Sequence, residues 1–173
     1  MLQLCRLIPI SLVVALLLQS AAAQSSIATA VPRSGDPEVY ASFFYFHDDF
    51  AKWIEERTKA DNTHGMKLTQ TAGALQKIQV TELPTVTTVS REVIKDLAKV
   101  QADRRKFVDQ SKTQKKTPDP STLREYQLQR NLIILSGVLK LRRTLSPASW
   151  AGLDSYINTQ HRLRIHQISA PSK

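Results

Sequence analysis

Apolar residues recur along most of this chain with the period of an α-helix. Strict alternation of polar and apolar residues, which marks a half-buried strand, is absent, and the chain holds only five glycines. The first helix is predicted over residues 37–60, because Asp36 is suited to cap it and Pro37 suits its first position. The period therefore predicts an all-α fold.

Further elements follow from breaks in the same period. After the first helix we expect a turn at 61–65, helices at about 67–79, 84–112, 121–145 and 147–167, a break at 81–84 and a charged linker near 112–120. The β-branched run at 85–89 is also compatible with a strand. The spacing of Val86, Val89 and Val93 favours a helix instead. We expect a single-domain antiparallel helical bundle of four to five helices.

The middle of the fourth predicted helix, LIILSGVL at 132–139, is apolar nearly all round. A helix of this kind is usually surrounded by other helices. Gly137 costs helix stability, but it allows a neighbouring helix to approach closely. We therefore expect a helix–helix contact at this glycine.

The first 23 residues have the three parts of a secretory signal peptide: a basic start, an apolar run from Leu7 to Leu18 and three alanines at 21–23. The apolar run is short for a membrane span. The expected divisions of the chain are a signal peptide at 1–23, a flexible leader at 24–36, a helical domain at 37–169 and a tail at 170–173. Cleavage after Ala23 would remove the only cysteine, Cys5, together with the apolar run, so we expect the mature chain to have no disulfide and no transmembrane anchor. We expect an exported protein, periplasmic or secreted, and the lack of cysteine favours a bacterial source.

The stretch VYASFFYFHDDFAKWIEERT at 39–58 gathers most of the aromatic residues of the chain around His47. On a helical wheel with about 100° per residue, His47 lies within the apolar arc, whereas Asp48 and Asp49 lie on the polar side. The positions three and four residues away from His47 carry only Phe and Ala, so a helical metal pair is excluded. We expect a core histidine with one hydrogen-bond partner. A catalytic or ligand-binding histidine completed by distant residues is the alternative.

Motifs for catalysis and cofactor binding are missing from the chain. It has no GxSxG elbow, no P-loop and no GxGxxG. His161 and His166 are five residues apart, which is poor spacing for metal ligands on a helix. The acidic pairs Asp48-Asp49 and Glu55-Glu56 are typical of a solvated face. We therefore expect no catalytic residue, no cofactor and no metal, with a hydrolase using His47 or His64 as an alternative.

Several core-like segments carry a resemblance to known proteins. They are FFYFHDDF in the first helix, ADRRKFVDQ in the third, LREYQLQRNLIILSGVLKLRRTL in the fourth and SPASWAGLDSYI after it. Their order and spacing resemble a group of small, exported, all-helical bacterial proteins for which no function is established. LSPASW is also similar in part to the LTxxQ pattern of periplasmic helical chaperones: Leu145 and Ser146 fit loosely, and Ser149 stands where glutamine is expected. The second resemblance implies a chaperone-like stress protein as an alternative function.

Basic residues are concentrated in the second half of the chain. The whole chain has a net charge of +9, and residues 104–173 hold fourteen Lys or Arg against four Asp or Glu. The grouped basic residues are Arg104, Arg105, Lys106, Lys112, Lys115, Lys116, Lys140, Arg142, Arg143, Arg162 and Arg164. One interpretation is a solvated basic surface that favours solubility. The other is a patch that attracts an anionic envelope surface or an acidic protein, since nucleic acid is not expected outside the cell.

Taken together, these patterns predict an exported, non-enzymatic helical protein that binds a protein or an anionic envelope partner through its surface. An apolar cavity between the helices would favour a ligand-binding protein, whereas a polar cleft that joins His47 to a carboxylate from another helix would favour an enzyme. The oligomeric state is left open.

The signal-peptide pattern gives a direct prediction. The exported protein is expected to begin at or near Gln24, because the three alanines before it offer the small residues that signal peptidase requires. N-terminal sequencing or intact mass spectrometry of the exported protein measures this. Recovery of the full-length chain from the membrane fraction would contradict the prediction.

Overall fold

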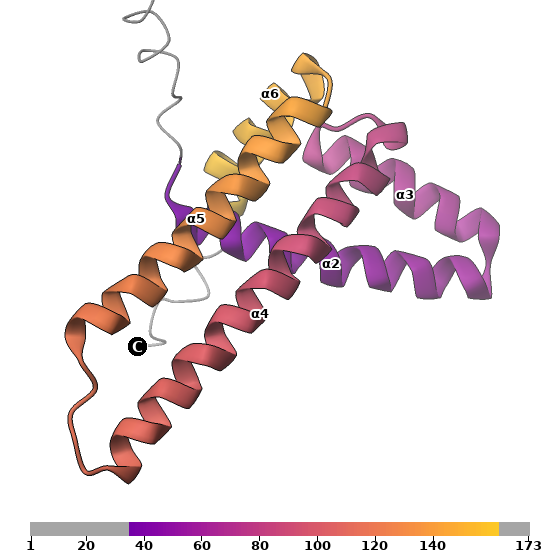
Figure 1. The fold of residues 1–173 in the computed structure, drawn as a ribbon. Coiled ribbons are helices and arrows are strands. Elements are labelled where there is room, and N and C mark those ends of the chain that lie inside the picture. Colours follow the sequence, from indigo (N-terminus) through magenta and orange to yellow (C-terminus); the bar gives the residue numbers. More distant parts are fainter. Residues whose placement is uncertain (1–34, 163–173) are drawn as a thin grey trace, which may run out of the picture. The chain divides into compact units, whose positions relative to one another are not determined.

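The computed structural model describes residues 35–162, which form five α-helices and two short helical turns of other types (Figure 1). The elements are α2 (Pro37–Ala60), α3 (Asn62–Gln76), the 3-10 turn η1 (Val80–Glu82), α4 (Leu83–Thr113), α5 (Pro120–Thr144), α6 (Pro147–Tyr156) and the π-helical turn η2 (Ile157–His161). No strand occurs among these residues. The all-α class and the helical bundle are therefore confirmed. The expected signal peptide, the leader up to residue 34, the end of the fifth helix beyond residue 162 and the tail lie outside the described residues.

The starts of α2, α5 and α6 agree closely with the predictions because their caps are visible in the sequence. The side chain of Asp36 accepts a hydrogen bond from the backbone N–H of Glu38 at 3.0 Å, and α2 begins at Pro37 as predicted. α5 and α6 begin in the same way, with a capping side chain followed by proline at the first helical position.

The predicted turn at 61–65 is wrong. α3 already begins at Asn62, because the carboxylate of Asp61 accepts hydrogen bonds from the N–H groups of Thr63 and His64 at 2.9 and 3.2 Å. Gly65 lies inside the helix, where an added Cβ would stand 2.1 Å from the hydroxyl oxygen of Thr58. The glycine thus permits close approach of α3 to α2 and does not form a turn.

The second predicted helix also ends earlier than expected. α3 stops at Gln76, and Lys77 adopts a left-handed conformation with φ 56°. The N–H of Ile78 then bonds the carbonyl of Gly73 at 2.8 Å, which closes the helix end. A glycine usually occupies this left-handed position, so the lysine gives no stop signal in the sequence.

The β-branched run at 85–89 is helical throughout, and α4 continues to Thr113. The linker is correspondingly shorter than predicted and covers 114–119. At the other end of the fold, α6 stops at Tyr156, and the π-helical turn η2 replaces the straight helix that the sequence predicts there.

α2 is the helix around which the others pack. It contacts α3, α4, α5 and η2, while α4 and α5 lie side by side as an antiparallel hairpin (Figure 1). The largest fully buried apolar and aromatic side chains come from α2, α4, α5, α6 and η2. They are Tyr40, Phe43, Phe44, Val86, Val89, Ile134, Leu141, Leu153, Tyr156 and Ile157. The aromatic stretch of the sequence is thus the centre of the core.

Gly137 marks a close contact between α5 and two other helices, as its position in the apolar run predicts. A Cβ at this position would stand 2.4 Å from Cγ2 of Val93 and 3.1 Å from Cζ of Phe44. Both neighbours are buried, so neither has free space into which to move.

Replacing Gly137 with alanine is expected to destabilise the fold by about 1–3 kcal/mol through overpacking. Helix propensity alone would stabilise the protein by up to about 1 kcal/mol, so the two effects have opposite signs. Chemical denaturation measures the difference. Ser136→Ala, at the exposed neighbouring position, should change stability by less than about 0.5 kcal/mol. A stabilising Gly137→Ala would contradict the close contact.

Candidate functional site

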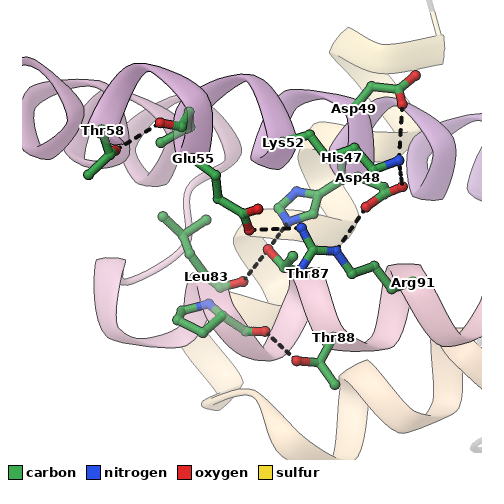
Figure 2. A network of polar contacts seen from close by, with 12 residues as sticks. His47, Asp48, Asp49, Lys52, Glu55, Thr58, Leu83, Thr87, Thr88 and Arg91 are labelled. Atoms are coloured by element: carbon green, nitrogen blue, oxygen red, sulfur yellow. Dashed lines mark hydrogen bonds and ion pairs between the residues drawn. The ribbon is translucent and has the colours of Figure 1, made fainter. Parts of the chain in front are cut away.

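His47 projects from the buried face of α2 toward α4 (Figure 2). Its side chain is only 3% exposed. Nδ1 lies 2.9 Å from the carboxamide oxygen of Gln76 in α3, and Nε2 lies 3.1 Å from the hydroxyl oxygen of Thr87 in α4. The expectation of a buried histidine is met, but the ring has two partners on two other helices where one was predicted.

The partners of His47 can serve either tautomer of the neutral ring. The hydroxyl oxygen of Thr87 lies 3.1 Å from Nε2 and also 3.1 Å from the carbonyl of Leu83, so its proton can go to either acceptor. The carboxamide of Gln76 offers its oxygen to Nδ1–H, and a half-turn of this nearly symmetric group offers its NH₂ to an unprotonated Nδ1 instead. Both nitrogens are therefore hydrogen-bonded whichever of them carries the proton.

Burial lowers the pKa of His47 to about 4. The hydrogen bond from the ring to the carboxamide oxygen of Gln76 and the charge of Asp48 act in the opposite direction but do not cancel this effect. The ring is therefore neutral at physiological pH. A neutral imidazole with both nitrogens engaged is poorly suited to act as a general base.

Asp48 lies in a different environment from the one predicted. It is buried, and its carboxylate forms ion pairs with Lys52 at 2.6 Å and with Arg91 of α4 at 3.0 Å. The prediction of a solvated face is wrong here, because α4 crosses α2 and places Arg91 over this position. The neighbouring Asp49 is exposed as predicted.

Arg91 joins two carboxylates of α2. Its guanidinium lies between Asp48 and Glu55, with Nη2 2.8 Å from the carboxylate of Glu55 (Figure 2). Burial acts to raise the pKa of Asp48, but hydrogen bonds from Lys52 and Arg91 outweigh burial and lower it. The charges on this side of His47 are thus matched in pairs.

A pocket of about 310 Å³ opens beside His47, between α2, α3, η1 and α4. Its apolar wall consists of Phe50, Ala51, Ile54, Ala72, Val80, Leu83 and Pro84. Phe50, which the helical wheel places in the core, is only partly buried because it lines this pocket. The volume is at the lower end of the range for small-molecule sites, about 300–1,000 Å³.

The polar groups of the pocket are already committed within the protein. The hydroxyls of Thr69, Thr87 and Thr88 each donate to a carbonyl of their own helix at 2.9 to 3.1 Å. Their oxygens retain only acceptor capacity. Because Glu55 and Arg91 pair with each other at the pocket, the pocket presents little net charge.

His161 is a second buried histidine, and it also packs against α2. The π-helical turn η2 directs it toward Phe43 and Phe46, with ring centroids 5.9 and 5.4 Å apart, and Nε2 lies 3.3 Å from the hydroxyl of Ser42. Helical spacing already places His161 on the face of the buried Ile157, but its partner Ser42 is 119 positions away in the chain, which periodicity cannot pair. His166 lies outside the described residues.

The remaining histidine of interest, His64, is exposed in the first turn of α3. Within residues 35–162, no three His, Cys, Asp or Glu side chains come together in a way that could hold a metal ion. The same residues contain no helix long and apolar enough to cross a membrane.

The grouped basic residues are distributed between the two ends of the α4–α5 hairpin. The C-terminal half of α4 and the following linker carry Arg104, Arg105, Lys106, Lys112, Lys115 and Lys116, whereas the C-terminal end of α5 carries Lys140, Arg142 and Arg143. Lys140 pairs with Glu92, in the N-terminal half of α4. Arg162 lies 3.9 Å from Asp36, and Arg164 is outside the described residues. Because α4 and α5 are antiparallel, the basic residues of the two helices lie at opposite ends of the hairpin. They therefore do not form one shared basic patch.

No protein-family model, curated protein or solved structure matches this chain.

The buried state of His47 predicts a pH-dependent stability. The pKa is about 4 in the folded protein against an ordinary value of 6.5, so the unfolded chain takes up a proton that the folded ring does not. The stabilisation is complete above pH 6.5 and is lost as the pH falls toward 4, by about 3 kcal/mol in total. Denaturation of the wild type and of His47→Gln at several pH values measures this.

The substitution His47→Gln should flatten the pH dependence between these two values. Gln70→Ala, at an exposed position of α3 without a titratable group, should leave it unchanged. Parallel curves for the wild type and His47→Gln would show that His47 titrates normally and would contradict the assignment.

Proposed function

We propose that this chain is an exported, non-enzymatic binding protein whose ligand site is the pocket beside His47. The observation that carries the proposal is the composition of the pocket: an apolar wall meets a neutral histidine whose two nitrogens are both hydrogen-bonded. A pocket of this kind favours ligand binding over catalysis. It offers a matching shape and an apolar surface that a ligand can cover, but no group suited to proton transfer.

The arrangement of charges gives further support against a hydrolase that uses His47. The ring bonds an amide and a hydroxyl, not a carboxylate that would orient it and stabilise its protonated form. The nearest carboxylates, Asp48 and Glu55, are both held by Arg91. His64 is exposed and lies outside this pocket.

The ligand class follows from what the pocket lacks. Its charges are paired, so an ionic ligand would gain little there. Its three threonine oxygens can accept hydrogen bonds but have no protons left to donate into the pocket. A compact, uncharged, apolar molecule with at most a hydroxyl or amine donor fits these conditions.

Export is part of the proposal and rests on the signal-peptide pattern in the sequence. An anionic partner receives less support, because the hairpin divides the grouped basic residues. A chaperone-like role rests only on the partial LTxxQ similarity.

Binding of N-phenyl-1-naphthylamine, an uncharged apolar fluorophore, tests the pocket. The wild type should enhance its emission in a saturable way. Ala51→Phe places a ring in the pocket and should weaken binding at least about tenfold, which corresponds to about 1.4 kcal/mol.

The matched control is Ala98→Phe, which adds the same ring at an exposed position of α4 outside the pocket. It should bind the fluorophore as the wild type does. Equal affinity of the wild type and Ala51→Phe, with both variants folded by circular dichroism, would mean that the pocket does not take this ligand class.

A further inference from the structure

The outer face of α5 carries a row of exposed leucines. Leu128, Leu132 and Leu139 are 56%, 66% and 47% exposed, which places them among the most exposed large apolar residues in the described part of the chain. Leu135 lies between them and is partly buried. Successive members are four, three and four residues apart, which is the heptad spacing of a two-stranded coiled coil.

The same spacing reaches a charged residue at each end of the row. Three residues before Leu128 stands Glu125, and three residues after Leu139 stands Arg142. All six positions fall within an arc of about 100° on the helix, on the side opposite the buried Ile134 and Leu141. The row is therefore acidic at one end, apolar in the middle and basic at the other end.

We propose that two copies of this chain pair through the leucine row, with their α5 helices antiparallel. A two-fold axis between residues 133 and 134 places Leu128 against the partner subunit's Leu139, and Leu132 against the partner subunit's Leu135. The same axis places Glu125 against the partner subunit's Arg142 at both ends. Every position of the row thus meets a complementary one, as an isologous interface requires.

Charge selects the antiparallel arrangement. A parallel pair would place Glu125 against Glu125 and Arg142 against Arg142, which is repulsive at both ends. Neither residue forms an ion pair with another residue of the described part of the chain, so both side chains are available to a partner.

The size of the row indicates a concentration-dependent dimer. From Glu125 to Arg142 the row is about 26 Å long and about one helix diameter, 10 Å, wide. Such a strip buries a few hundred Å² on each copy, below the total of about 1,200 Å² that is typical of stable interfaces. The net charge of +9 on each chain also opposes association.

Sedimentation equilibrium of the purified protein over a wide concentration range tests the proposal. The average mass should rise from that of one copy toward that of two. Leu132→Glu should abolish the rise. Met66→Glu, which alters a similarly exposed apolar residue on α3, should leave it intact.

A charge-exchange cycle tests the direction of pairing. Glu125→Arg and Arg142→Glu should each raise the dissociation constant at least about tenfold, because each creates two like-charge contacts. The double variant Glu125→Arg with Arg142→Glu should return to near the wild-type value. Since the two single variants change the net charge in opposite directions, a general charge effect cannot weaken both.

Three results would overturn the proposal: a single-copy mass at every concentration, association that survives Leu132→Glu, or a double variant no tighter than the single ones. Far-UV circular dichroism of each variant establishes that it is folded, which is expected because all three substituted positions of the row are exposed.

Discussion

Burial of one imidazole ring constrains the arrangement of three helices in this protein. A polar group taken out of water must keep its hydrogen bonds, or the fold loses stability. His47 stands in the aromatic face of α2, and its two nitrogens are satisfied by Gln76 from α3 and Thr87 from α4. The packing of α3 and α4 against α2 is thus tied to one side chain. The pocket beside the ring follows from the same geometry, because these helices and η1 form its walls.

Two properties of α2 therefore work together. Its aromatic residues supply the apolar area that holds the helices, while Asp48 and Glu55 bind Arg91 of α4 at the edge of that area. Because the charges are paired and the ring is neutral, the pocket is apolar without an uncompensated charge beside it. This is the physical basis for the binding role proposed for the site.

Much of the fold could be predicted from the sequence because its signals are local. Asp36 with Pro37, and Ser146 with Pro147, mark helix starts, and the helical period identifies the buried face of α2. The predictions fail where contacts between helices, and not local sequence signals, determine the backbone or the burial of a side chain. Gly65 suggests a turn but allows close packing against Thr58, and a left-handed lysine ends α3 without a glycine. The partners of His47 and the burial of Asp48 depend on residues 29 to 43 positions away in the chain, which periodicity cannot pair.

The central claim is that His47 is a neutral, hydrogen-bonded part of the core at the edge of the pocket proposed to bind a ligand. Nuclear magnetic resonance of the ¹⁵N-labelled imidazole over a pH titration tests it most directly. The account predicts a neutral ring with a pKa near 4 and both nitrogens shielded from solvent. A pKa near or above the ordinary 6.5 would contradict it.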